Sequence, residues 1–280
     1  MKSVVAVLLN TIVVVVMINT VSWLPADELP AGIVDAERVE AATELVFTEG
    51  PAFHRDGSVY FTDIANNRIM RLPPGGENAE TFIRPSGRAN GLMFDAHGNL
   101  LACEGNERGG LGGRRLTRFD IVSKKRTVIV DRFEGKRFNS PNDIVQASNG
   151  TYYFTDPPYG LPEQENSASR EIEAFGVYKI DSNGKVDMVV SNLKRPNGVA
   201  LSPDEKILYV NQSDSKAPYI MAYKIQQDGS LDEGRIFFDA SSLQESGLKG
   251  SLDGLKVAQD GTLFSTGPGG VLVITPKGKL

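Results

Sequence analysis

Five polar side chains recur at one aligned position of the sequence, and their types suit the binding of a metal ion. Each stands directly before a short apolar run and carries a carboxylate or amide oxygen: Glu49, Asn90, Asn142, Asn197 and Asp253. They follow one another at intervals of 41, 52, 55 and 56 residues. Hard cations such as Ca²⁺ and Mg²⁺ prefer oxygen ligands of this kind. If the fold brings these positions together, they form one cation site.

The segments that carry these residues share one pattern, which indicates paired β-strands. A polar lead residue is followed by an apolar run, a turn and a second apolar run, as in NGLMFDAHGNLLACE and NGVALSPDEKILYVN. The apolar runs are short, rich in β-branched and aromatic residues, and bounded by turn residues, which is typical of a β-hairpin. The turn lies eight residues after the lead residue in every copy, at Gly57, Gly98, Gly150, Glu205 and Gly261.

Five copies at this spacing predict a β-propeller, whose four-stranded blades recur about every 40–50 residues. The residues between the hairpins supply outer strands, such as GVYKI and VDMVV in the third copy. The first strand of each blade lines the central axis, so the five lead residues, named the inner ring here, should surround that axis. The second strand returns to the same face, which predicts a second ring at Asp63, Glu104, Asp156 and Asn211.

A purely structural role is the alternative for the inner ring. Asn and Asp before Gly are common in turns because they tolerate left-handed backbone conformations. This alternative does not account for Glu49, because Glu is not a favoured turn former, nor for five copies that use only Glu, Asn or Asp. For the second ring both roles stay open, because Asp residues at strand ends often cap turns.

The composition disfavours several other kinds of site. The formal net charge is −5 without a basic stripe, so nucleic acid is not an expected partner. The two histidines, His54 and His97, lie in or near turns and are expected to face solvent, which disfavours a His-rich zinc site. Neither a G-x-S-x-G motif nor a P-loop occurs. The single cysteine, Cys103, cannot form an internal disulfide and is expected to be a buried apolar residue.

Two further features are expected near the inner ring. Arg88 lies two residues before Asn90, where its paired donors could hold a substrate carboxylate, hydroxyl or carbonyl. The segment TDPPYG, residues 155–160, is made rigid by two prolines and could wall the channel mouth with Tyr159. A surface position for Arg88 and a structural role for TDPPYG are the alternatives.

The N-terminus has the pattern of a targeting segment. Lys2 precedes the mostly apolar run SVVAVLLNTIVVVVMI, which is short for a membrane span. We therefore expect residues 1–26 to be a signal peptide or an N-terminal anchor, followed by a polar spacer over residues 27–40. The protein is then exported, with no membrane contact beyond this leader.

The chain resembles the SMP-30/gluconolactonase/LRE-like family. The matching motifs are EGPAF, GRANGL, SPNDIV with YYFTDPPYG, RPNGVALSPDEKILYV and SLDGLKVAQDGTLFSTGPGGV, which span residues 49 to about 275. The resemblance implies an all-β, six-bladed propeller and a divalent-metal-dependent lactonase, usually a gluconolactonase. Its substrate is then a small lactone.

The same resemblance implies a set of metal ligands. Glu49, Asn197 and Asp253 match the core ligands of the family, and Asn142 matches an additional ligand. Members of the family hold Ca²⁺, Zn²⁺, Mg²⁺ or Mn²⁺. The oxygen ligands of this chain favour one divalent cation, with Ca²⁺ as the first choice.

The resemblance also implies substrate contacts and a mechanism. Arg88 and Asn90 match a substrate-positioning pair, and Glu104 matches a further substrate contact. The cation would polarise the lactone carbonyl, and Asp253 or Glu104 would take a proton from the attacking water. Two other functions stay open: hydrolysis of another lactone, an ester or a phosphoester, and binding without catalysis.

The resemblance is incomplete at the C-terminal end. The chain stops at Leu280, 27 residues after Asp253, where a sixth blade would follow in the family. We therefore expect about five blades and a C-terminally incomplete propeller domain over residues 41–280, with blade six largely missing. The segment ELVF, before Glu49, is expected to supply a closing strand.

Overall fold

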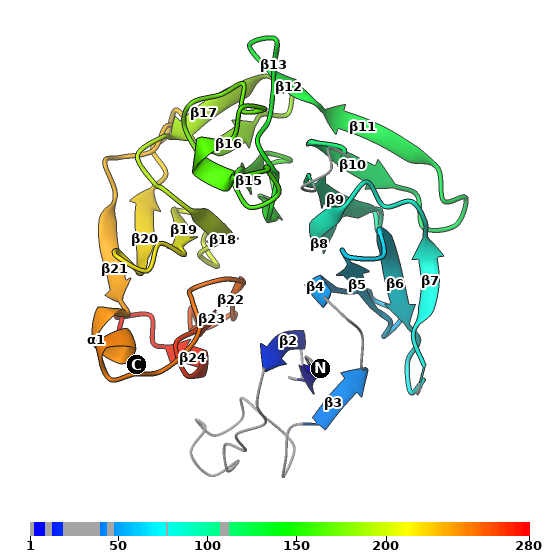
Figure 1. Ribbon diagram of the computed structural model, residues 1–280, viewed down its shortest axis with the longest axis horizontal. Helices are drawn as coiled ribbons and strands as arrows, with labels where there is room; N and C mark the ends of the chain where they lie inside the picture. Colours follow the sequence, from blue (N-terminus) through cyan, green and yellow to red (C-terminus); the bar gives the residue numbers. More distant parts are fainter. Residues whose placement is uncertain (1–2, 9–12, 19–39, 44–47, 77, 107–111) are drawn as a thin grey trace.

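The computed structural model describes residues 3–8, 13–18, 40–43, 48–76, 78–106 and 112–280. Within these residues, five antiparallel sheets are arranged around a common centre (Figure 1), which confirms the predicted all-β propeller with five blades. The first four sheets have four strands each, and the fifth has three.

The strands of each blade follow the chain order. Blade 1 contains β4 (Thr48–Phe53), β5 (Val59–Asp63), β6 (Arg68–Leu72) and β7 (Glu80–Ile83). Blade 2 contains β8 (Ala89–Phe94), β9 (Leu100–Glu104), β10 (Arg115–Phe119) and β11 (Arg126–Val130). Blade 3 contains β14 (Ile144–Gln146), β15 (Tyr152–Thr155), β16 (Val177–Ile180) and β17 (Val186–Val190).

Blade 4 contains β18 (Pro196–Leu201), β19 (Ile207–Gln212), β20 (Tyr219–Lys224) and β21 (Arg235–Asp239). Blade 5 contains β22 (Leu255–Val257), β23 (Leu263–Gly267) and β24 (Gly270–Ile274). Three short elements lie between blades or strands: the hairpin β12 (Arg132–Phe133) and β13 (Lys136–Arg137), the 3₁₀ turn η2 (Gln164–Asn166), and α1 (Ser241–Glu245).

The hairpin turns follow the aligned spacing of the sequence. All five predicted turn positions have positive φ angles: Gly57, Gly98, Gly150, Glu205 and Gly261. Glycine adopts this conformation without a steric cost, which explains four of the five residues. At Glu205, where φ is 54°, the carboxylate instead accepts hydrogen bonds from the backbone and hydroxyl of Ser148 in the neighbouring blade. This turn therefore contributes to the contact between blades 3 and 4.

The apolar core lies between neighbouring blades. Ile69 of blade 1 belongs to one buried cluster with Leu92 of blade 2, and Leu116 of blade 2 belongs to the next cluster with Tyr178 of blade 3. Two further clusters join blades 3 and 4 and blades 4 and 5. Each fully buried large apolar side chain contributes about 1.5–3 kcal/mol. The blades are thus held face to face, which fixes their inner strands relative to one another.

A further sheet lies between the first and last blades. Strands β1 (Ser3–Leu8), β2 (Val13–Ile18) and β3 (Glu40–Thr43) pair in the order β2-β1-β3, and β2 lies beside β4 and β24 (Figure 1). The apolar N-terminal segments therefore form strands in the structure. The signal peptide or anchor over residues 1–26 stays a prediction. Most of the expected spacer and all of ELVF lie outside the described residues. In the described part of the chain, no helix is long and apolar enough to cross a bilayer.

Two side-chain predictions have different outcomes. Cys103 is fully buried in the apolar cluster between blades 2 and 3, as expected, and burial raises its pKa well above the ordinary value. The prediction that His54 faces solvent is wrong. Its ring is buried against Phe94, with 4.8 Å between ring centroids, and its Nδ1 lies 2.9 Å from Asp56 Oδ1. His97 is exposed, as expected.

Candidate metal site

The inner-ring residues lie at corresponding ends of the innermost strands. In Figure 1, β4, β8, β18 and β22 are the strands of their blades that lie nearest the centre. Glu49, Asn90 and Asn197 are the second residues of β4, β8 and β18. Asn142 and Asp253 lie two residues before β14 and β22. All five lead residues therefore lie within two residues of the start of the first strand of their blade.

The backbone carbonyls of the lead residues bind the preceding blade. Thr62 Oγ1 donates to the Asn90 carbonyl at 3.1 Å, and the Gly91 N–H donates to the Asn142 carbonyl at 2.6 Å. The same relation continues through blades 3 to 5. Thr155 Oγ1 donates to the Asn197 carbonyl at 2.7 Å, and the Gly198 N–H donates to the Asp253 carbonyl at 3.0 Å. These bonds hold four of the lead residues through their backbone carbonyls rather than through their side chains, namely Asn90, Asn142, Asn197 and Asp253.

The glycine that follows a lead residue is required by this close approach. A Cβ on Gly50, Gly91 or Gly198 would overlap the carbonyl oxygen of the next lead residue, which is Asn90, Asn142 or Asp253 respectively. Because that oxygen belongs to the backbone of another blade, it cannot move aside cheaply. The Gly of the repeated Asn-Gly pair thus allows the backbones of neighbouring blades to approach closely. The Asn side chain is not explained by the turn alone.

The side chains of Asn197 and Asp253 interact at the junction of blades 4 and 5. Asn197 is buried, and its Nδ2 donates to Ser213 Oγ at 3.1 Å. Ser213 Oγ in turn donates to the Leu252 carbonyl in a short hydrogen bond. Burial raises the pKa of Asp253 to about 6, and a hydrogen bond from Asn197 opposes this rise. Ser213 therefore orients one predicted ligand beside another.

A second acid, the buried Asp143, lies nearby. Its negative charge is a further cause of the raised pKa of Asp253. Asp143 Oδ2 accepts a hydrogen bond from the Val199 N–H at 3.1 Å and lies 4.0 Å from Lys256 Nζ. The site therefore holds the buried Asp143 near the partly buried Asp253, and a bound divalent cation would favour the charged form of Asp253.

Tyr159 lies beside the same pair. Its hydroxyl is buried and has no hydrogen bond to the described residues. Burial raises the pKa of Tyr159 to about 12, the charge of Asp253 raises it further, and Ser213 and Asn197 oppose the rise. The sequence placed TDPPYG at the channel mouth, and the structure places its tyrosine next to Asn197, Ser213 and Asp253.

The residue types of the inner ring fit a hard cation. Glu49 and Asp253 supply carboxylates, and Asn142 and Asn197, both buried, supply amide oxygens. Calcium and magnesium bind such mixed carboxylate and amide sets. Among the residues that the structure describes, no group of three or more His, Cys, Asp and Glu side chains forms a metal cluster. A site at the inner ring would therefore depend on its amide oxygens as well as its two acids.

Arg88 and Asn90 are held by contacts with blade 1. Arg88 has a left-handed backbone, with φ of 59°, and its Nη1 donates to the carbonyls of Ile64 and Ala65 at 2.6 and 2.7 Å. Its backbone N–H donates to Asn67 Oδ1 at 2.9 Å. These bonds place the guanidinium over the loop between β5 and β6. The predicted role of Arg88 and Asn90 in substrate positioning stays a prediction.

The prediction that Glu104 contacts substrate or accepts a proton does not fit its placement. Its carboxylate is fully buried and bonds Arg115 Nε at 2.7 Å and Thr117 Oγ1 at 3.0 Å. Arg126 Nε lies 3.3 Å from the same carboxylate. Arg115 and Thr117 belong to the outer strand β10, and Arg126 belongs to the outer strand β11. Glu104 therefore joins the strands of blade 2, and we assign it a structural role.

The other members of the second ring are also bound within the protein. Asp63 accepts from Arg68 Nε at 2.8 Å, and Asn211 Nδ2 donates to the Asp253 carbonyl at 2.7 Å. Asp156 accepts from the backbone N–H groups of Asn139 and Ser140, each at 2.7 Å. All four side chains are completely buried. The structural alternative for the second ring is therefore the better account.

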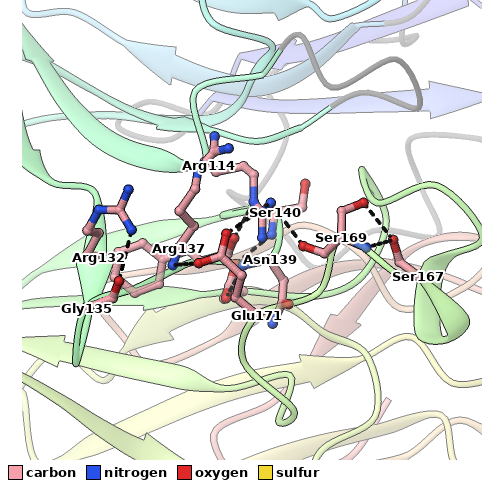
Figure 2. A network of polar contacts seen from close by, with 11 residues as sticks. Arg114, Arg132, Gly135, Arg137, Asn139, Ser140, Ser167, Ser169 and Glu171 are labelled. Carbon is pink, nitrogen blue, oxygen red and sulfur yellow. Dashed lines mark hydrogen bonds and ion pairs between the residues drawn. The ribbon is translucent and has the colours of Figure 1, made fainter.

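Arg114, Arg137 and Glu171 belong to a polar network in the loops that join blades 2 and 3 (Figure 2). Arg114 Nε donates to the Phe138 carbonyl at 2.5 Å, and its Nη1 donates to the Ser169 carbonyl at 3.2 Å. Glu171 accepts from the Arg137 N–H at 2.8 Å. The segment between β15 and β16, which carries Tyr159, is thereby attached to both blades.

Two residues of this site were missed by sequence reasoning. Ser213 gives no signal, because it lies two residues beyond the aligned strand end. Asp143 does give one: it follows the lead residue Asn142 at a position that is Gly in the other four copies. An acid in place of a repeated glycine is a departure that a comparison of the copies can detect.

Comparisons with known proteins give a consistent result. The family model described as SMP-30/Gluconolactonase/LRE-like region matches residues 47–280. A gluconolactonase from Zymomonas mobilis is 34% identical over 254 residues, which cover 85% of this chain and 69% of the relative. A solved gluconolactonase structure from Xanthomonas campestris is 31% identical with a TM-score of 0.73, covering 85% of this chain and 75% of that one.

A more distant relative extends the comparison. The lactonase drp35 of Staphylococcus epidermidis is 26% identical over 187 residues, which cover 65% of this chain and 52% of the relative. The family match covers most of the chain, and it includes all five lead residues. The chain therefore belongs to the SMP-30/gluconolactonase/LRE-like family.

Proposed function

We propose that this protein hydrolyses a sugar-acid lactone, with glucono-1,5-lactone as the first candidate, at a divalent cation held by the inner ring. The observation that carries the proposal is the arrangement at blades 4 and 5. The amide of the buried Asn197 lies beside the partly buried carboxylate of Asp253, and the backbone carbonyl of each residue accepts a hydrogen bond from the preceding blade. The names of the Zymomonas and Xanthomonas relatives support the substrate class.

Each inner-ring residue has a distinct part in this proposal. Glu49 and Asp253 contribute the charge that holds the cation, and Asn142 and Asn197 contribute neutral oxygens. When bound, a divalent cation supplies a Lewis acid that polarises a lactone carbonyl and acidifies a water molecule. Ca²⁺ is the first choice because all four ligands are oxygen donors. Export through the N-terminal leader is part of the same proposal.

Asp253 is the residue that accepts the proton of the attacking water. Burial raises the pKa of Asp253 from 3.8 to about 6 in the cation-free protein, and a bound cation would favour its charged form, which is the form that accepts a proton. The hydrogen bond between Asn197 and Ser213 keeps the amide in place beside the carboxylate during this transfer. Glu104 has no part in the step, because its carboxylate is bound by Arg115 and Thr117.

The proposal is tested by acid release from glucono-1,5-lactone. The purified chain is treated with EDTA and then supplied with Ca²⁺, Mg²⁺, Mn²⁺ or Zn²⁺. We expect hydrolysis above the spontaneous rate only with a cation, and a loss of at least about 100-fold in Asp253→Asn. The matched control is Asp260→Asn, which changes an exposed aspartate in the turn of the same blade and should keep full activity.

Two results would contradict the proposal. A folded wild-type protein that gives only the spontaneous rate with every cation excludes hydrolysis of this lactone. A rate that survives EDTA excludes the cation. A panel of other aldonolactones, simple esters and phosphoesters then decides whether the same site acts on another substrate.

A further inference from the structure

The hydroxyl of Tyr159 is a buried polar group for which the protein provides no hydrogen bond in the described residues. A buried hydroxyl without a partner costs about 1–3 kcal/mol. Such groups are therefore uncommon in folded proteins unless a water, an ion or a ligand binds them. The position of this hydroxyl, beside Asn197, Ser213 and Asp253, indicates what that partner is.

The backbone around Tyr159 is held firmly. Pro157 and Pro158 fix two φ angles directly before it, and the Leu161 N–H donates to the Pro158 carbonyl at 2.9 Å. Gly160 lies so close to Ser140 Oγ and the Asn106 carbonyl that a Cβ would overlap both. These close contacts with the loops of blades 2 and 3 hold the segment that carries Tyr159.

The ring of Tyr159 is held from the other side by Arg195. The guanidinium carbon lies 5.9 Å from the ring centroid, which is within the range of a cation–π contact. Arg195 is itself bound by Glu165 Oε1 at 2.6 Å and by Gln164 Oε1 at 3.0 Å. These contacts orient the ring and do not involve the hydroxyl of Tyr159.

We propose that Tyr159 is a substrate-contacting residue, whose hydroxyl donates a hydrogen bond to an oxygen of the lactone bound beside Asn197 and Asp253. This inference rests on the proposed function and adds a residue from a segment that supplies none of the predicted ligands. Lactones of sugar acids are rich in acceptor oxygens, namely the carbonyl, the ring oxygen and several hydroxyls. A rigid, preoriented donor at the edge of the ion site suits such a ligand.

The test is Tyr159→Phe, which removes the hydroxyl and keeps the ring. With saturating Ca²⁺ we expect kcat/KM for glucono-1,5-lactone to fall about 10- to 100-fold, as for the loss of one hydrogen bond. The Kd for Ca²⁺ should stay at the wild-type value, because the hydroxyl does not bind the ion. The Tm should not fall, because the protein provides no hydrogen bond to this hydroxyl in the described residues. The matched control is Tyr223→Phe, which removes another buried, unbonded hydroxyl from the core between blades 3 and 4 and should leave kcat/KM unchanged.

The outcomes separate this inference from the proposed function. An active wild type with a Tyr159→Phe rate within twofold of it overturns the inference alone. A parallel fall in Ca²⁺ affinity also overturns it, because the hydroxyl would then act on the ion site. An inactive wild type overturns the proposed function and this inference together.

Discussion

The backbone N–H of Gly198 donates to the carbonyl oxygen of Asp253 at 3.0 Å, which joins the innermost strand of blade 4 to the lead residue of blade 5. The relation recurs between Gly91 and Asn142 at 2.6 Å. In both pairs a glycine from one blade contacts the backbone of a predicted metal ligand from the next. The glycine of the repeated Asn-Gly sequence thus spaces the blades, and we predict that the Asn side chain supplies an oxygen to the inner-ring site.

Gly198→Ala should destabilise the protein by about 1–3 kcal/mol, because the added Cβ overlaps the Asp253 carbonyl. The matched control is Gly254→Ala, where, among the described residues, a Cβ would meet only Thr266 Oγ1, at 4.0 Å. This control should change the free energy of unfolding by less than about 0.5 kcal/mol. Urea denaturation measures both. Equal stabilities for the two variants would show that the blades do not approach each other as described.

Glu104→Gln tests the structural role of that carboxylate. We expect a loss of about 3 kcal/mol in unfolding free energy, because Arg115 and Arg126 lose their shared partner in a buried position. The KM for substrate should not change in the folded fraction. Glu80→Gln, which removes an exposed partner of Arg71, is the control and should cost about 0–1 kcal/mol. A stable Glu104→Gln protein with a raised KM would instead support the prediction that Glu104 contacts the substrate.

Asp156 should make stability depend on pH. Burial raises its pKa from the ordinary 3.8 to about 7, although two backbone N–H groups oppose the rise. Between about pH 4 and about pH 7 the folded state therefore holds a proton that the unfolded state has lost, so the free energy of unfolding falls as pH rises through this window. The effect is on the order of a few kcal/mol.

Asp156→Asn removes this titration. Its amide cannot accept from both N–H groups, so the variant should be less stable than the wild type at pH 5. Its Tm should then fall less than that of the wild type between pH 5 and pH 8, which calorimetry measures. Parallel Tm profiles for the two proteins would mean that Asp156 is ionised throughout this range.

Cation binding should stabilise the folded state. A ligand that binds only the folded protein adds about 2.7 kcal/mol at 100 times its Kd. We therefore expect Ca²⁺ to raise the Tm of EDTA-treated wild type and to leave the Tm of Asp253→Asn unchanged. Asp260→Asn should respond like the wild type. An equal rise in all three proteins would place the bound ion elsewhere.

The sequence predicts the fold well because its signals are local and repeated. The five hairpins, their turn positions and the lead residues all follow from one spacing, and even Glu205 adopts the positive φ of its glycine counterparts. The outer strands of blade 3 also lie where GVYKI and VDMVV place them. These features depend on residues that are close together in the chain, so a pattern within one copy is sufficient.

The partners of the second ring are less predictable. Spacing shows that Glu104 ends an inner strand, but its partners Arg115, Thr117 and Arg126 come from outer strands that have no aligned pattern. His54 was expected to face solvent, and only the packing of Phe94 from the next blade explains its burial. Contacts with the outer strands of the same blade decide the case of Glu104, and a contact between blades decides that of His54. The aligned hairpin pattern contains neither.

The central claim is that one cation binds to side chains from separate blades. A crystal structure of the full chain grown with Ca²⁺ tests it most directly. We expect a single ion on the propeller axis, with oxygens of Glu49, Asn197 and Asp253 at about 2.3–2.6 Å. An ion bound elsewhere, with these three side chains making no contact with it, would contradict the claim.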